Sequence, residues 1–293
     1  MRGLPLAFAT LTLCFTHALS CETLGDVLAA NSVPVRILPA DDLQRNITSF
    51  AVSAGNSPFL IAYYDDDGSG LLSPVLHVLR YDERTHDLRQ TNLHGAGVPL
   101  QGFHNVIGQI SDDCMGSALA ILEKDGFITI DTHINPSAGC VLVLTSDLSF
   151  NAELRGWALA RINGEIIFEE GTVHFASTHP ARLTLYDPRQ RQMLPIYPAQ
   201  EDAARQQFSA ELKKHLPSSE WCAQQNNPCD PQSFTTDIDH VSVSEQERSF
   251  AFDARMNADG FGEDAARSVQ PKTIHYVCRQ SDGKWILSIA PVE

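Results

Sequence analysis

The sequence predicts an all-β protein, because short apolar runs alternate with turn-forming residues over most of the chain. Lys124-Asp125-Gly126 separates two such runs and is a typical hairpin sequence. Runs of this length, bounded by Gly, Asp, Asn or Pro, are typical of strands. Strands are therefore expected at 49–52, 59–64, 75–79, 118–122, 127–130, 141–145, 165–168, 173–176, 182–186, 193–197, 240–243, 249–254, 273–277 and 285–289.

One helix is expected among these strands, near residues 201–215. Its apolar residues recur at helical spacing, acidic residues occupy its first turn, and Lys213-Lys214-His215 occupies its last. Pro217 then ends the helical pattern. A shorter helix is expected at 24–30.

The strands fall into groups of four, at about 48–92, 117–157, 164–198 and 238–290. The first three groups each contain a strand that ends in Asp before a polar turn, at Asp82, Asp147 and Asp187, and the last two of these are 40 residues apart. This pattern resembles the blades of β-propeller repeat proteins. The resemblance implies a propeller-like array of four four-stranded antiparallel blades, or five, with 35–38 available to complete one. A β-sandwich or two smaller β-domains is the alternative.

The first twenty residues have the layout of a secretory signal peptide. Met1-Arg2 gives a positive start, residues 4–15 are apolar and uncharged, and Ala18-Leu19-Ser20 is an acceptable cleavage site. We therefore expect a signal peptide at 1–20, a single β-rich domain at 21–293, and a secreted or periplasmic protein. Because Cys21 follows the cleavage site directly, a lipid anchor on this cysteine is the alternative. No stretch is long and apolar enough to span a bilayer as a helix.

The cysteine count fits an oxidising compartment. Six cysteines follow the leader, an even number that predicts three disulfides. Asn226-Asn227-Pro228 favours a turn between two of them, and the propeller arrangement would bring a second pair to the same face of one blade. The expected pairs are Cys222–Cys229, Cys114–Cys140 and, closing the array from its N-terminus to its last group, Cys21–Cys278.

The charge of the chain excludes one class of partner. The net charge is −15, and it becomes −16 without the leader, which holds one Arg and no acid. Such a surface repels nucleic acid, and no basic cluster interrupts it. A protein or a carbohydrate is the expected ligand.

The candidate ligand site lies on one face of the predicted array. The loops between the second and third strands of the first three groups, at 65–74, 131–139 and 177–181, would emerge together there, with His133 and His179 as candidate ligand residues. Asp65, Asp67 and Ser69 alternate as in the first half of a calcium loop, so calcium is the candidate ion. Leu76 stands where an EF-hand needs its glutamate, and a plain solvated turn is the alternative.

Two functions fit these features. The sequence holds no nucleophile elbow, zinc-protease helix, dinucleotide loop or P-loop. The first hypothesis is therefore a secreted binding or interaction protein on a disulfide-stabilised β-scaffold. The second is a secreted hydrolase that acts on carbohydrate through carboxylates of the loop-rich face. Three tryptophans could act as sugar-binding platforms or as packing residues: Trp157, Trp221 and Trp285.

Overall fold

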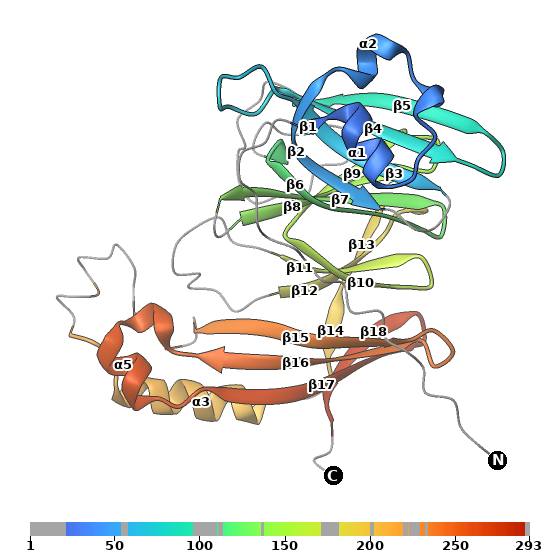
Figure 1. Ribbon diagram of the computed structural model, residues 1–293. Helices are drawn as coiled ribbons and strands as arrows, with labels where there is room; N and C mark the ends of the chain where they lie inside the picture. The colour runs from blue at the N-terminus through green and yellow to red at the C-terminus, as the bar shows by residue number, and fades with distance from the viewer. Residues whose placement is uncertain are drawn as a thin grey trace, which may run out of the picture.

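The computed structural model describes residues 22–53, 58–95, 110, 114–135, 138–170, 182–199, 202–218, 222, 229–231 and 234–290. Within these residues the chain forms four sheets of four or five strands, which follow one another in sequence (Figure 1). The pairing is antiparallel apart from one parallel pair, β14 with β18. The predicted all-β, propeller-like array of four blades is confirmed.

The first two sheets are simple meanders. In the first, strand order follows chain order from β1 to β5, and in the second from β6 to β9. Their strands are β1 (Glu22–Thr23), β2 (Asn46–Ser53), β3 (Phe59–Asp65), β4 (Val75–Asp82), β5 (Asp87–His94), β6 (Ser117–Lys124), β7 (Phe127–Asn135), β8 (Ala138–Thr145) and β9 (Phe150–Arg155).

The third and fourth sheets are linked by an exchanged strand. The third runs from β10 to β13, whereas the fourth has the order β14-β18-β17-β16-β15, so β14 leaves its sequence neighbours and pairs with the last strand. Their strands are β10 (Trp157–Ile162), β11 (Glu165–Glu170), β12 (Arg182–Asp187), β13 (Gln192–Leu194), β14 (Ile196–Pro198), β15 (Thr235–Ser244), β16 (Ser249–Asn257), β17 (Lys272–Ser281) and β18 (Lys284–Ile289).

The helices are short except for one. Helix α3 (Ala203–Lys214) confirms the helix expected near 201–215, and the Asp202 side chain caps it by accepting a hydrogen bond from the Arg205 amide. Helix α1 (Leu24–Ala30) starts with a capping box between Thr23 and Asp26. The other helical segments are α2 (Ala40–Leu43), α5 (Glu263–Ser268) and the 3₁₀ turns η1 (Val35–Ile37) and η3 (Asp259–Phe261).

A β-bulge recurs in the first long strand of every sheet. In each case this strand has one residue more than the neighbouring strand between the same two paired positions. The extra residue bends the strand and changes the direction of its side chains. The bulges lie between Thr48 and Ala51 in β2, Ala118 and Ala120 in β6, Ala158 and Ala160 in β10, and Asp239 and Ser242 in β15. The four sheets are therefore variations of one structural unit.

Each sheet packs on the next through a separate apolar core. Tyr64 and Leu142 belong to the core between the first and second sheets, and Val143 and Phe168 to that between the second and third. The third and fourth sheets share the largest core, which α3 joins through Phe208 and Leu212. The outer side of the first sheet is covered by α1, with Leu24 and Leu28 fully buried.

The array is open rather than closed into a ring. The first and fourth sheets lie at opposite ends in Figure 1, and no core formed by the described residues joins them. This corrects the expected Cys21–Cys278 disulfide, because Cys278 is a free thiol buried in the last core. Cys21 lies outside the described residues, but Glu22, the residue after it, belongs to the first sheet.

Prolines explain two further corrections. Residues 35–37 form the 3₁₀ turn η1 instead of a strand, in a segment bounded by Pro34 and Pro39. The single strand expected at 193–197 is divided by Pro195, which has no N–H to donate to a ladder. The strand expected at 173–176 lies outside the described residues.

The other two expected disulfides are present. Cys114 and Cys140 have Cα atoms 5.5 Å apart, and Cys222 and Cys229 have Cα atoms 5.6 Å apart. Both distances lie within the range that a disulfide requires, and the bonds fit an extracellular or periplasmic setting. Among the described residues, no helix has the length and apolar character needed to cross a membrane.

Candidate functional site

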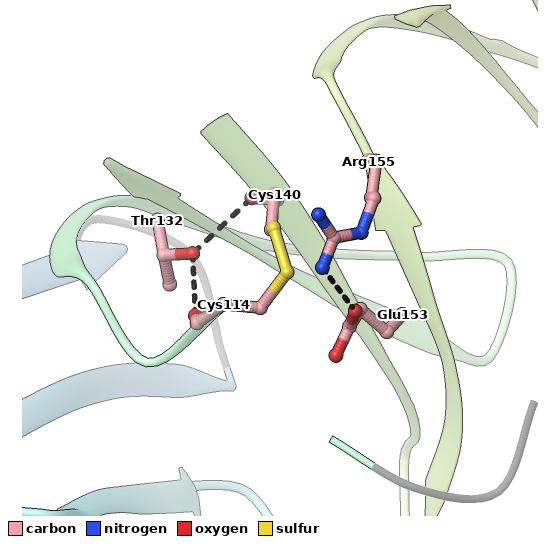
Figure 2. Close-up of a disulfide and its surroundings, with 5 residues drawn as sticks. All are labelled: Cys114, Thr132, Cys140, Glu153 and Arg155. Atoms are coloured by element: carbon pink, nitrogen blue, oxygen red, sulfur yellow. Dashed lines mark hydrogen bonds and ion pairs between the residues drawn. A yellow bond between two sulfur atoms is a disulfide. The ribbon is translucent and has the colours of Figure 1, made fainter. Parts of the chain in front are cut away.

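The Cys114–Cys140 disulfide identifies the loop face that the sequence predicts. It joins the segment that leads into β6 to the start of β8 (Figure 2). In an antiparallel sheet, the start of β8 lies at the same edge as the end of β7 and the start of β6. In the first sheet, the corresponding edge contains the end of β3 and the start of β4. In the third sheet, it contains the end of β11 and the start of β10.

The predicted calcium residues lie on this face, and all three already have protein partners. Asp65 ends β3 and bonds the Nε2 atom of His77 at 3.1 Å, with an Arg45 guanidinium nitrogen 3.6 Å away. Asp67 accepts the Ser69 amide, and Ser69 accepts the Leu71 amide, so both act as turn-forming side chains. The calcium site stays a prediction.

Of the two predicted histidines, His133 lies in β7 beside a tryptophan, and His179 lies outside the described residues. The His133 and Trp157 rings have centroids 6.0 Å apart. Trp157 opens β10 directly after Gly156, whose φ of 136° is a conformation suited to glycine. This turn starts the third sheet and places the indole at the edge of the second.

Trp157 rests on the backbone of Gly139. A Cβ atom at position 139 would lie 2.5 Å from the six-membered ring, so only glycine leaves room for the indole there. The Gly156 amide also bonds the Gly139 carbonyl at 2.9 Å, which fixes the start of β10 against β8. Trp157 is partly buried, so some of its surface stays accessible.

Glu169 is paired with Trp157 across β10 and β11 and belongs to an acidic group. Burial raises its pKa to about 7, and the negative charges of Asp237 and Asp239 on β15 act in the same direction. The Asn257 side-chain amide donates to Asp237 at 3.0 Å. At the start of β10, the Trp157 ring contacts the second sheet at Gly139, and its cross-strand partner Glu169 is close to carboxylates of the fourth sheet. We call Trp157, Glu169, Asp237 and Asp239 the rim cluster.

Two other carboxyls with raised pKa values have structural partners. Burial raises the pKa of Asp131 to about 7, although the charge of Arg161 opposes the shift. Arg161 in turn donates to the Lys124 and Phe127 carbonyls and so fastens the third sheet to the second. Burial also raises the pKa of Glu165, which accepts a hydrogen bond from the Trp285 indole at 3.1 Å.

The disulfide region itself is a buried polar cluster (Figure 2). Thr132 donates to the Cys114 carbonyl at 2.9 Å, and Glu153, fully buried, pairs with Arg155 at 3.5 Å. The sulfur atoms and a Glu153 oxygen lie within 4.8 Å of one another, a grouping that could hold a metal ion. Because the sulfurs are bonded to each other, we assign this cluster a structural role.

The sequence predicts His133 as a ligand residue, which stays a prediction, and it does not predict the carboxylates of the rim cluster. The sequence predicts for Trp157 only that, like two other tryptophans, it either binds sugar or packs in the core. Glu169 is one of 36 acidic residues, and no local pattern separates it from the others. The signal that could have indicated Trp157 is Gly156-Trp157, an aromatic residue directly after a glycine between two predicted sheets.

Comparisons with known proteins give no family. No family model matches the chain, and no curated protein matches it. Among solved structures, an exo-β-1,3-galactanase of Bifidobacterium bifidum, described as putative, is 9% identical with a TM-score of 0.31, over 84% of this chain and 72% of its own. A GH43 β-1,3-galactosidase is 7% identical, with a TM-score of 0.31 over 85% and 47%.

A third structure, an endo-1,4-β-xylanase of Bacteroides thetaiotaomicron, is 9% identical with a TM-score of 0.28 over 85% of this chain and 95% of its own. Likenesses of this strength do not bear on activity. The functional conclusion therefore depends on the chemistry of the rim cluster.

Proposed function

We propose that this chain is an exported carbohydrate-binding protein whose ligand lies on the rim cluster. The observation that carries the proposal is the partly buried Trp157, whose ring lies against Gly139 and whose cross-strand partner on β11 is Glu169. The two disulfides support an oxidising destination, secreted or periplasmic, with a lipid anchor on Cys21 as the alternative.

The chemistry of the rim cluster suits a sugar. A pyranose presents C–H groups on its faces, which pack against an aromatic ring, and hydroxyl donors around its edge. Carboxylates accept such donors in charge-assisted hydrogen bonds. Asp237 and Asp239 are exposed, and the partly buried Glu169 is close enough for their charges to raise its pKa. The exposed carboxylates of Asp237 and Asp239 would repel the phosphates of a nucleic acid.

A glycan screen tests the proposal. The mature chain is applied to an array of plant, animal and microbial oligosaccharides, and each ligand found is titrated by calorimetry. We expect Trp157→Ala to weaken binding at least tenfold. Tyr197→Ala is the matched control, because Tyr197 is an exposed aromatic residue on β14, outside the rim cluster. Equal binding by the Trp157→Ala variant and the wild type would contradict the proposal.

Glycoside hydrolysis is the second candidate function, and one observation favours it. Glu169 has a pKa raised to about 7 next to two further carboxylates, which suits a general acid paired with a base or nucleophile. Release of reducing sugar from the ligands of the screen, lost in Glu169→Gln with binding retained, would establish hydrolysis. No release by the wild type leaves the binding function.

A further inference from the structure

Strand β6 exposes a run of apolar side chains to solvent. Leu119 is 45% exposed and Leu122 50% exposed, and Ala120 between them is exposed as well. Leu119 is the extra residue of the β6 bulge, and β6 is an edge strand of the second sheet. Contiguous apolar surface of this kind is typical of binding sites, whereas isolated exposed leucines are common on any protein. We call Leu119, Ala120 and Leu122 the apolar stripe.

The strand register shows that the apolar stripe faces the third sheet. Residues paired across neighbouring strands lie on the same face of a sheet. On β7, Asp131 is the partner of Ala120, and Thr129 is the partner of Leu122. Both partners interact with Arg161 of β10, which donates to Thr129 at 3.0 Å and attracts the Asp131 carboxylate. Ala120 and Leu122 therefore point to the side on which β10 lies.

One end of the apolar stripe lies close to the rim cluster. The Asp131 carboxylate, beside Ala120, accepts a hydrogen bond from the amide of Ala158, the residue that follows Trp157. His133 lies two residues further along the same face of β7, and its ring is beside the Trp157 indole at a centroid distance of 6.0 Å. The apolar surface of β6 thus begins next to the residues proposed to hold the sugar.

The other end of the apolar stripe is bounded by charge. Lys124 follows Leu122 on the same face of β6, and its Nζ atom lies 2.9 Å from a carboxylate oxygen of Glu245. Glu245 belongs to the turn between β15 and β16 of the fourth sheet. Four residues of a strand span about 13 Å, so the surface between Ala120 and Lys124 suits an apolar group of that length.

We propose that the ligand of the rim cluster is a glycoside whose sugar lies at Trp157 and whose apolar aglycone covers the apolar stripe. The inference rests on the proposed function, because it extends the same ligand from the sugar site along β6. An apolar aglycone gains free energy by removing two leucines from water, and a free sugar has no comparable apolar group. The carboxylates of Asp237 and Asp239 repel phosphate, so an uncharged aglycone fits better than a phosphate-linked lipid.

Titration calorimetry with paired glycosides tests the inference. The probes are the methyl and octyl β-glycosides of glucose, galactose, xylose and N-acetylglucosamine, used below the concentration at which the octyl compounds form micelles. We expect the octyl glycoside of at least one sugar to bind the mature chain at least tenfold more tightly than its methyl counterpart. The heat-capacity change of that octyl glycoside should also be more negative, because it buries more apolar surface.

Two variants locate the aglycone. For the double variant Leu119→Ser/Leu122→Ser, we expect the octyl and methyl glycosides to bind with equal affinity. Leu71→Ser is the matched control, because Leu71 is 75% exposed in the loop between β3 and β4, outside the apolar stripe. This control should keep the tenfold advantage of the octyl glycoside. Thermal melts verify that both variants are folded.

Equal affinity of the wild type for the octyl and methyl glycoside of every sugar would overturn the inference. A tenfold octyl advantage that survives in Leu119→Ser/Leu122→Ser would overturn it as well. Octyl glycosides that bind equally well to the wild type and to Trp157→Ala would overturn a ligand shared by the sugar site and the apolar stripe. If oligosaccharides of the array bind and lose affinity in Trp157→Ala, the proposed function stands even when octyl chains add nothing.

Discussion

At the scale of single residues, the position of the Trp157 ring depends on one missing Cβ atom. Gly139→Ala places that atom 2.5 Å from the indole, and we expect the ring to move. The displaced packing should lower the free energy of unfolding by about 1–3 kcal/mol, weaken glycan binding and change the tryptophan emission. Urea denaturation and fluorescence measure these effects.

The control for this substitution is Gly68→Ala. Gly68 has a φ of 75° with open space around it, so alanine there costs backbone strain alone, about 1–2 kcal/mol. The emission spectrum of this variant should equal that of the wild type. If Gly139→Ala also leaves the emission and the glycan affinity unchanged, the indole does not depend on Gly139.

Glu169 should make stability depend on pH. Its folded-state pKa of about 7 lies above the value of roughly 4.3 for an unfolded glutamate. The folded chain therefore keeps a proton that the unfolded chain releases, and stability falls as pH rises through this window. Glu169→Gln removes the effect. We expect it to match the wild type at pH 4 and to exceed it by about 1–2 kcal/mol at pH 8.

Denaturation curves recorded from pH 4 to pH 8 test this expectation. Glu263→Gln, on an exposed helix position, serves as the control and should follow the wild type throughout. A constant difference between Glu169→Gln and the wild type over the whole range would show that Glu169 does not titrate in this window.

Single residues of the site were the hardest to predict from the sequence. His133 is predicted in a loop at 131–139, whereas the structure has it inside β7, and its role as a ligand residue stays a prediction. Glu169 could not be predicted, since burial raises its pKa first of all, and the charges of Asp237 and Asp239, which lie about 70 residues later in the chain, add to the shift. Proximity of that kind arises from packing between sheets and has no local signal.

At the scale of elements, the disulfides differ in the length of chain that they close. Cys114–Cys140 has a sequence separation of 26, and Cys222–Cys229 has one of 7. By loop-closure entropy, their removal should cost about 3–4 and about 2–3 kcal/mol, respectively. The double variants Cys114→Ser/Cys140→Ser and Cys222→Ser/Cys229→Ser, compared by urea denaturation, measure both.

The longer bridge also fastens the loop face, so its loss should affect ligand binding as well. Removal of the shorter bridge leaves the rim cluster untouched and is the internal control. Equal or inverted destabilisation of the two double variants would contradict this ranking.

Most elements followed from local sequence, and two of the exceptions have local causes too. The strands could be predicted from hairpin turns such as Lys124-Asp125-Gly126 and from the alternation of apolar residues. The run of residues between Pro34 and Pro39 forms η1 instead of a strand. Pro195 interrupts the strand expected at 193–197, so that β14 is separate from the strands of the third sheet. The parallel pairing of β14 with β18 could not be foreseen, because it joins segments almost 90 residues apart.

At the scale of the whole molecule, the central feature is an open array of four sheets. The repeated strand pattern predicts the four sheets. Whether the sheets close into a ring depends on how strongly the array curves from one sheet to the next, and the length of a repeat does not specify this curvature. The open form leaves Cys278 as a free thiol in the last core, where burial raises its pKa to about 12. We expect Cys278 to resist alkylation in the native chain and to react fully in denaturant.

Peptide mapping without reduction provides the measurement. The Cys278 peptide should carry the alkylating group only after unfolding, and the Cys114–Cys140 and Cys222–Cys229 peptides should remain linked and serve as controls. A Cys278 peptide joined to Cys21 would mean that the array closes.

Hydrogen exchange with a glycan ligand bound tests the location of the functional site most directly. The chain is exchanged with and without the oligosaccharide identified by the array, and the amides are located by mass spectrometry. We predict that protection increases at the end of β7, the start of β10, the end of β11 and the start of β15, which surround the rim cluster. Protection confined to other segments, such as β4, β5 or β18, would contradict a site built on Trp157 and Glu169.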